Sequence, residues 1–371
     1  MIIISNRLRE LDFLRGIAII LVLLRHQHLF EFTTKMGWIG VDLFFVLSGF
    51  LVSGLLFKEY IKYGDIKPKL FLIRRGFKIY PIYFLSYFLY LTPKLIKGQF
   101  DLKGFLSDIF FIQNYVWGWG YAYVPTWSLA IEEHFYFGLA ILLYFLIENK
   151  IFNFKINMKA FKIDFFQVIL LFSFLFCLIV RIYNNMYHPE YEEKNVTMTH
   201  LRMDSLFAGV FISYLYYFKN EILTGFFNSY KKGLIVIAFL LLSFTPFIDF
   251  EESFFVRTFG MTFLYISFGI FLVYFLIDNN VNSKLNIIFS ERGVNVVSKI
   301  GFSSYSIYII HGFANFFFSV LSVYVLKFQI NPILLFFMTS TTSVLSGMFM
   351  THYIEEHFLK IRDKYYPSRV N

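Results

Sequence analysis

An arginine and a histidine stand at the two ends of one apolar stretch near the start of the sequence, "RGIAIILVLLRH", from Arg15 to His26. On an α-helix, the eleven-residue step turns about 20° past three full turns and rises about 16 Å, so both side chains share one face. Arginine is always charged, whereas histidine exchanges a proton near neutral pH. The pair predicts a fixed cation at one depth and a base at another. The alternative is a snorkelling arginine with a hydrogen-bonded core histidine.

Two acidic residues in later apolar stretches are candidate partners of His26. Asp42, in "GVDLFFVLSGF", follows a short predicted loop, so antiparallel packing would place it at the depth of His26. A carboxylate beside a histidine fixes its tautomer and stabilises the imidazolium. Glu132, in "WSLAIEEHFYF", is expected near the same depth and could orient a substrate or assist proton transfer. We predict His26 as general base with Asp42 and Glu132 as catalytic partners. The alternative for Asp42 is an ion pair with a cation of another span, with Arg202 as the first candidate.

A basic cluster ends the most basic loop that we predict, 58–78, in the stretch "FLIRRGFKIYP". It contains Arg74, Arg75 and Lys78, and the charge pattern places Arg15 on the same side of the membrane. Arginine binds phosphate through paired hydrogen bonds, so we predict that these four residues form a phosphate-binding site. The alternative is simple anchoring of the loop at the cytoplasmic face.

Polar and aromatic side chains at the opposite ends of several spans are candidates for binding a substrate. The loop "VWGWGYAYVP" is rich in aromatic residues and glycine, which is typical of an interfacial belt or of a platform that stacks a sugar. We expect no metal. The predicted substrate-binding residues are Trp127, Ser128, Arg202, Asp204, Tyr308 and His311.

The composition indicates the elements that must hold these residues. Hydrophobic residues make up 57% of the 371 and charged residues 16%, below the roughly one quarter usual in soluble domains. The mean hydropathy is +0.60, and apolar runs of spanning length recur along the chain. A charge at the centre of a span costs roughly 2.5–3.5 kcal/mol on insertion scales. The charged residues within the spans should therefore converge on a polar cavity or pair with one another.

We predict an all-α fold, a single membrane-embedded domain covering residues 1–371. A short segment at 104–114 is expected to be re-entrant or interfacial. The fold is expected to contain about ten membrane helices, at 11–30, 38–57, 79–93, 127–147, 165–183, 203–218, 233–249, 258–277, 303–325 and 332–353.

The distribution of basic residues predicts the orientation. Of the 34 Lys and Arg residues, 23 fall in the two terminal tails and the predicted loops 58–78, 148–164, 219–232 and 278–302. Such an excess marks the cytoplasmic side, so both termini should be cytoplasmic in the inner (plasma) membrane. The net charge of +9 then reflects contact with anionic lipids rather than with nucleic acid.

Six stretches, taken in order, resemble one family, the integral-membrane acyltransferase-3 proteins, which include bacterial O-antigen acetylases. The stretches are the Arg15–His26 spacing, "GVDLFFVLSGF", "RRGFKIYPIY", "WSLAIEEHFYF", "RMDSLFAG" and "FSSYSIYIIH". The resemblance implies transfer of an acyl group, usually acetyl from acetyl-CoA, to a hydroxyl of an extracytoplasmic surface glycan such as O-antigen. The paired arginines of the family fall on Arg75 and Lys78, so the second is lysine here.

The predicted function is therefore O-acyl transfer from acyl-CoA. Membrane lipids and a free or lipid-linked glycan are the expected partners, and the sequence does not specify an oligomeric state. A proton- or ion-coupled transporter would also bury Asp42, Glu132 and His26 in spans. A non-catalytic glycan-binding protein would use the aromatic loop, but it has no need of a basic cluster opposite His26.

The orientation leads to a first test. A reporter fused after residue 371 should report a cytoplasmic location, and one inserted near Glu192 should report the opposite side. Alkaline phosphatase and fluorescent-protein fusions measure both. If the residue 371 fusion is active outside, Arg15 and Arg75 do not face cytoplasmic CoA.

Overall fold

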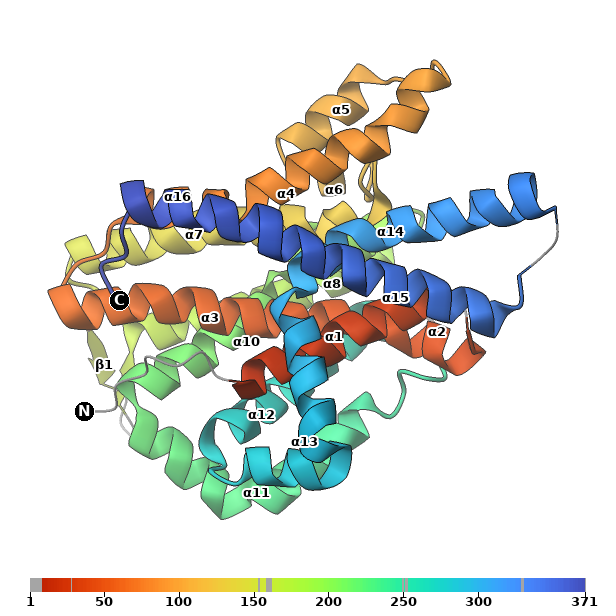
Figure 1. Ribbon diagram of the computed structural model, residues 1–371. Helices are drawn as coiled ribbons and strands as arrows, with labels where there is room; N and C mark the ends of the chain where they lie inside the picture. Colours follow the sequence, from red (N-terminus) through yellow and green to blue (C-terminus); the bar gives the residue numbers. More distant parts are fainter. Residues whose placement is uncertain are drawn as a thin grey trace.

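The computed structural model describes residues 9–27, 29–152, 154–157, 162–248, 250, 253–327 and 330–370. Helices form nearly all of this part of the chain (Figure 1). In the first half they are α1 (Arg9–Gln27), α2 (Glu31–Gly37), α3 (Ile39–Tyr63), α4 (Pro68–Ile96), α5 (Leu102–Ile109), α6 (Gln113–Val116) and α7 (Trp127–Glu148).

The second half begins with a short antiparallel pair of strands and continues with helices. The strands are β1 (Lys155–Asn157) and β2 (Lys162–Asp164). The helices are α8 (Phe165–Tyr187), α9 (Glu192–Thr197), α10 (Thr199–Phe218), α11 (Asn220–Leu242), α12 (Met261–Ile277), α13 (Val281–Phe302), α14 (Ser304–Val320), α15 (Pro332–Met350) and α16 (Glu356–Tyr365). Three of these helices adjoin a short π-helical segment. Val256–Gly260 precedes α12, Leu321–Leu326 follows α14 and Thr351–Glu355 follows α15.

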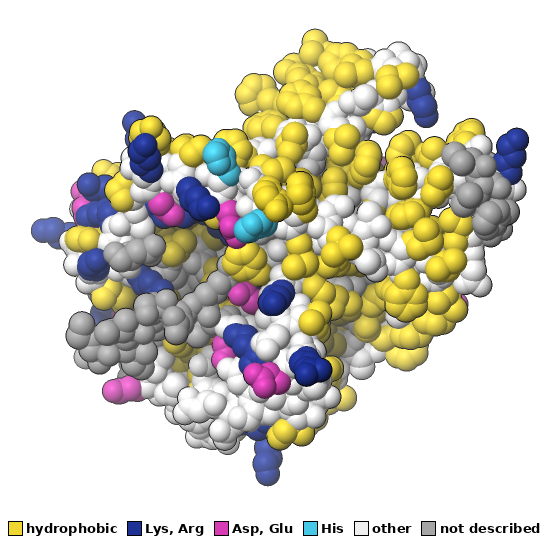
Figure 2. Space-filling model, in the orientation of Figure 1, with side chains coloured by type: hydrophobic (Ala, Val, Ile, Leu, Met, Phe, Trp, Pro, Cys, Tyr) yellow, Lys and Arg dark blue, Asp and Glu magenta, His cyan; other side chains and the backbone are white. Residues whose placement is uncertain are grey.

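Several of these helices have the length and composition of membrane spans. Six helical stretches of the described residues qualify: Glu31–Tyr63, Val124–Glu148, Phe165–Tyr187, Asn220–Leu242, Val256–Ile277 and Pro332–Tyr365. Apolar side chains also cover much of the upper and right-hand parts of the face shown in Figure 2, while many of the Lys and Arg side chains lie on its left and in its lower centre. The expected all-α membrane bundle is therefore confirmed, whereas the number of ten spans stays a prediction.

Close backbone contacts bring the site-bearing helices together. A methyl group on Gly49 of α3 would overlap the carbonyl oxygen of Leu206 on α10, and one on Gly209 would overlap the carbonyl oxygen of Val46. Only glycine lets α3 and α10 approach this closely. A glycine also allows α1 and α13 to approach closely, because a methyl group on Gly301 would overlap the carbonyl oxygen of Asp12.

The segment 278–302, predicted as a loop, is mostly helical. Its sequence is polar, but α13 buries Val281, Leu285 and Val294 against Phe13 of α1. Tertiary packing of such a stripe stabilises a helix that its composition alone does not reveal. The helix is kinked at Ser290, whose φ is +60°.

The basic stretch that we predicted as the end of loop 58–78 is also helical. Gly64 ends α3 in the left-handed conformation (φ +74°), and Pro68 begins α4. Lysine and arginine are good helix formers, and proline suits the first helical turn, so α4 begins well before the apolar run. The predicted segment 104–114 divides into α5 and α6, and α2 occupies the expected loop between α1 and α3.

A carboxylate just beyond α12 links three helices. Asp278 contacts Lys231 of α11, and Lys284 of α13 lies 2.7 Å away. Burial raises the pKa of Asp278, but hydrogen bonds from the two lysines outweigh this effect and hold the pKa below its usual value. A lowered pKa in the folded state means that the charged form stabilises the fold above the pKa of the unfolded chain.

Asp278→Asn should therefore lower the free energy of unfolding by about 1 kcal/mol at pH 7, a modest value because both lysines are partly solvated. The difference from the wild type should shrink as the pH falls below about 4, where the carboxyl of the unfolded chain becomes protonated. Thermal unfolding in detergent across this pH range measures both effects. Glu148→Gln, at an exposed position, is the control, and a pH-independent difference would contradict the assignment.

Candidate active site

Two cavities adjoin in the middle of the bundle. The first, which we call the basic cavity, has a volume of about 100 Å³ and is lined by Arg15, Arg75, Lys78 and Glu132 among others. The second, the tryptophan cavity, has a volume of about 610 Å³, and its lining includes His26, Arg202 and the three tryptophans Trp38, Trp119 and Trp127. Arg15 and His26 of α1 therefore lie in different cavities, as their separation along one helix face leads one to expect.

The basic cavity brings together three of the four predicted donor-binding cations. The Nε and Nη2 atoms of Arg15 donate to Ser304 Oγ, at 3.2 and 3.1 Å. The guanidinium of Arg75 stacks on the ring of Tyr136, at 4.4 Å. Lys78 Nζ lies 3.7 Å from the Glu355 carboxylate.

Arg74, the fourth predicted cation, faces the C-terminal helix instead. Its Nη2 lies 3.0 Å from Asp363 of α16, and its Nη1 donates to the carbonyl of Tyr366. The one-residue step from Arg75 turns a helical side chain by about 100°, which explains why neighbours in the sequence have different surroundings.

Glu132 lines the basic cavity rather than the one that contains His26. Its carboxylate interacts electrostatically with Arg75 of α4, which lines the same cavity. On the same wall, the Tyr136 hydroxyl lies 2.6 Å from Ser48 Oγ. The neighbouring Glu133 is outside the lining and accepts a hydrogen bond of 2.8 Å from the Tyr80 hydroxyl. Glu132 is thus placed among the predicted donor-binding cations.

The tryptophan cavity surrounds His26, an exposed side chain on its wall, with aromatic rings. The aromatic loop supplies Trp119, and α7 supplies Trp127, whose rings lie 6.0 Å apart, edge to face. Glu192 and Glu193 of α9 complete one side. Trp38 was not among the predicted site residues. Its position two residues before the "GVDLFF" stretch, at the N-terminal end of α3, is the signal that could have identified it.

A second histidine packs against His26. The ring centroids of His26 and His311 lie 4.9 Å apart, and His311 is 1% exposed. Nδ1 of His311 is 2.7 Å from the carbonyl of Tyr308, which can only accept, so this contact favours a proton on Nδ1. The Tyr123 hydroxyl lies 3.0 Å from Nδ1 and 3.2 Å from Nε2. His311 is thus held by hydrogen bonds beside His26.

Tyr308 and Ser128 form a hydrogen-bonded pair between the cavities. Their hydroxyl oxygens lie 2.8 Å apart, and the Tyr308 hydroxyl donates to the carbonyl of Pro125 at 2.9 Å. Ser128 lines the basic cavity, whereas Tyr308 lines both. Two of the predicted substrate-binding residues thus occupy the boundary between them.

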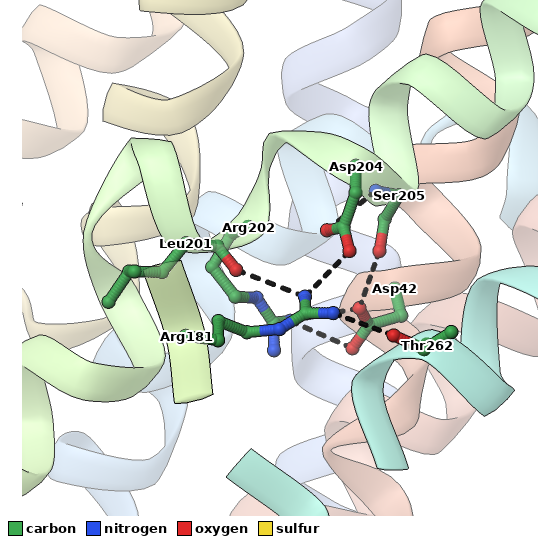
Figure 3. Close-up of polar contacts among 7 residues, drawn as sticks. All are labelled: Asp42, Arg181, Leu201, Arg202, Asp204, Ser205 and Thr262. Carbon is green, nitrogen blue, oxygen red and sulfur yellow. Dashed lines mark hydrogen bonds and ion pairs between the residues drawn. The ribbon is translucent and has the colours of Figure 1, made fainter. Parts of the chain in front are cut away.

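Asp42 lies in an ionic network deep in the bundle (Figure 3). Both of its carboxylate oxygens accept hydrogen bonds from Nη2 of Arg202, at 2.9 and 2.8 Å, and Ser205 donates to Oδ1 at 3.0 Å. Asp42 is fully buried and Arg202 is 3% exposed. The partner of Asp42 in the structure is therefore Arg202, the alternative to His26 in the sequence analysis. Arg202 itself reaches the tryptophan cavity.

A second ion pair completes the network and was missed from the sequence. Arg181 of α8 lies 2.6 Å from Asp204 of α10, and both side chains are fully buried. Arg181 also donates to the carbonyl of Leu201 at 3.1 Å and to Thr262 of α12 at 2.7 Å. Asp204, predicted to bind substrate, is in the lining of neither cavity, and its role in binding stays a prediction. An arginine inside the predicted span 165–183 was the available signal, because it requires an acidic partner.

Comparison with known proteins agrees with this arrangement. Residues 8–352 match the family described as acyltransferase domain, which covers nearly the whole chain. The chain therefore belongs to the integral-membrane acyltransferase-3 family, as the six sequence stretches indicated.

Relatives within this family are named for O-acetyl transfer. A Staphylococcus aureus (strain COL) protein named "Putative O-acetyltransferase" is 35% identical over 147 residues, which cover 36% of this chain and 24% of that protein. The "Peptidoglycan O-acetyltransferase OatA" of Listeria monocytogenes is 33% identical over 148 residues, 34% of this chain and 22% of the relative. The matched part is thus about a quarter of each relative's length or less. No solved structure matches the chain.

The buried ion pairs lead to a stability test. Arg181→Met should destabilise the fold by about 3–5 kcal/mol, because it leaves the Asp204 carboxylate buried without compensation. Adding Asp204→Asn should recover most of this loss, since the uncompensated charge is removed. Thermal unfolding of the purified single and double variants measures the effect. Equal losses in the two variants would show that packing, not charge, is what Arg181 contributes.

Proposed function

We propose that this protein is an O-acetyltransferase that moves an acetyl group from acetyl-CoA to a hydroxyl of a glycan outside the membrane. The proposal rests on the two adjoining cavities. One is lined by cations, and the other is lined by aromatic rings and the His26 imidazole. The chain that contains them belongs to the acyltransferase-3 family. The carbohydrate named for one relative, peptidoglycan, is a candidate acceptor, and another surface glycan is equally compatible with the cavity.

The donor would bind with its phosphates at the basic cavity. Arg15, Arg75 and Lys78 supply three cations there, and Arg75 is held in place by stacking on Tyr136. Such charges attract a diphosphate and bind it through charge-assisted hydrogen bonds. The separation of Arg15 from His26 along α1, about 16 Å, suits the pantetheine arm that connects the phosphates to the thioester.

The acceptor would bind in the tryptophan cavity. A volume of about 610 Å³ accommodates more than one sugar ring, and Trp119 and Trp127 offer apolar faces against which sugar C–H groups pack. Arg202 lies 5.8 Å from the Trp127 ring, so the Asp42–Arg202 pair would hold this tryptophan in place. Asp42 then acts as a positioning residue through Arg202.

The chemistry follows from the position of His26 beside this cavity. The imidazole takes the proton of the acceptor hydroxyl while the oxygen attacks the thioester carbonyl, and the C–S bond then breaks. The imidazolium returns the proton to the departing thiolate. His311, whose Nδ1 contacts the Tyr308 carbonyl, packs its ring beside His26. Glu132, beside Arg75, would hold that guanidinium against the donor.

The orientation required is the one predicted from the basic residues. With both termini cytoplasmic, the basic cavity faces the CoA pool and His26 faces the opposite side of the inner membrane, where the glycan lies. Acetyl groups would then cross the membrane within the protein.

Two substitutions separate donor binding from chemistry. Arg75→Ala should mainly raise KM for acetyl-CoA, because it removes contacts made in both the ground and the transition state. His26→Ala should lower kcat by at least about 100-fold while CoA still binds, because general-base catalysis contributes 10²–10⁴-fold. Thiol release and acetylated glycan, measured on purified enzyme in lipid nanodiscs, give both constants.

Matched controls are available on the surface. Arg292→Ala on α13 and His188→Ala beyond α8 change the same residue types at exposed positions. Near-normal kcat in His26→Ala would refute the general-base role. Proton-coupled substrate uptake without thiol release would instead support the transporter alternative.

A further inference from the structure

The boundary between the two cavities is narrow and is made of identifiable side chains. Only Val41 of α3 and Tyr308 of α14 appear in the linings of both cavities, among the residues that the structure describes. Valine is short and apolar, so the tyrosine ring provides most of the barrier. Ser128 stands on one side of this ring, and Pro125 lines the cavity on the other.

Tyr308 is held in its position by contacts around the ring and at the hydroxyl. The hydroxyl donates to the Pro125 carbonyl at 2.9 Å and lies 2.8 Å from Ser128 Oγ. Phe44 meets the ring edge to face, with centroids 6.4 Å apart. The side chain is 7% exposed. These contacts fix one rotamer across the passage between the cavities.

The proposed reaction needs such a barrier, because water that reaches the thioester hydrolyses it without acetylating the acceptor. In hydrolysis, the water oxygen bonds to the acetyl carbon, the C–S bond breaks, and acetate and the CoA thiol are released with one proton. The tryptophan cavity is large and contains the exposed His26, which would activate water as readily as a sugar hydroxyl. Excluding water from the reactive carbonyl until the acceptor is bound prevents this side reaction.

We propose that Tyr308 is the partition between the donor and acceptor cavities and that it suppresses hydrolysis of the donor thioester. This inference rests on the proposed function for the roles of the two cavities, but the partition itself is a property of the structure. In the resting protein, the ring closes the passage. The acyl arm reaches His26 by displacing the ring from Ser128 and Pro125.

The first experiment measures the ratio of hydrolysis to transfer. Tyr308→Ala removes the ring and should raise acetate formed per acetylated glycan by about tenfold or more, because water then reaches the thioester. Tyr308→Phe keeps the ring but loses both hydroxyl contacts, so its ratio should lie between those of the wild type and the alanine variant. Tyr87→Ala, an equally buried tyrosine of the same hydrophobic cluster outside both linings, is the control and should leave the ratio unchanged.

The second experiment needs no catalytic activity. Ser48 lines the basic cavity, and Cys177, the single cysteine of the chain, is fully buried. Ser48→Cys is introduced with Cys177→Ser, and a charged, membrane-impermeant methanethiosulfonate is added from the side of His26. Labelling should be slow with Tyr308 present, intermediate with Tyr308→Phe and fast with Tyr308→Ala.

The two measurements distinguish failure of the inference from failure of the proposed function. Unchanged labelling and an unchanged ratio in both Tyr308 variants would overturn the partition. A wild-type protein that does not turn over acetyl-CoA would refute the proposed function, while Tyr308-dependent labelling would still support the partition. If Tyr308→Ala does not fold, the comparison of wild type with Tyr308→Phe carries the same test.

Discussion

Asp42 and Arg202 remain charged in the interior of an apolar bundle because each neutralises the other. Asp42 is fully buried and Arg202 is nearly so, and either charge alone would be costly to bury. The adjacent Arg181–Asp204 pair is explained in the same way. Together the four residues connect α3, α8 and α10, and the hydrogen bond from Arg181 to Thr262 adds α12. Because an ion pair of this kind tolerates little displacement, it fixes α3 relative to α10, and the walls of both cavities depend on that placement.

The two cavities show how one membrane helix can serve two chemical environments. Helix α1 presents Arg15 to the basic cavity and His26 to the tryptophan cavity, three turns apart on one face. Helix α14 does the same over a shorter distance, with Ser304 against Arg15 and His311 against His26. A cation and a titratable base in one apolar stretch are thus compatible, because each is turned toward its own polar space and partner helix.

Much of this arrangement was predictable from helical periodicity and the cost of burying charge. They predict that Arg15 and His26 lie at different depths on one face of α1, and the two residues line different cavities. These two arguments do not predict features that depend on contacts between helices far apart in the sequence. The helix α13 is polar in composition and exists because α1 offers it an apolar stripe, and Arg74 turns away because α16 supplies a carboxylate. The partner of Asp42 could be narrowed to two candidates, but choosing Arg202 required the register of α10 against α3, which spacing within a single segment does not contain.

The packing of α1 against α13 and α14 also dictates the order in which the site is assembled during synthesis. Arg15 and its hydrogen-bond partner Ser304 are 289 residues apart in the chain, and Tyr308 and His311 are further along still. Helix α1 leaves the ribosome first, yet its glycine-mediated contact with α13 and its polar contacts with α14 form only after most of the chain has been made. Neither cavity exists in the nascent protein before then. The candidate active site is therefore incomplete until α14, near the end of the chain, has been made.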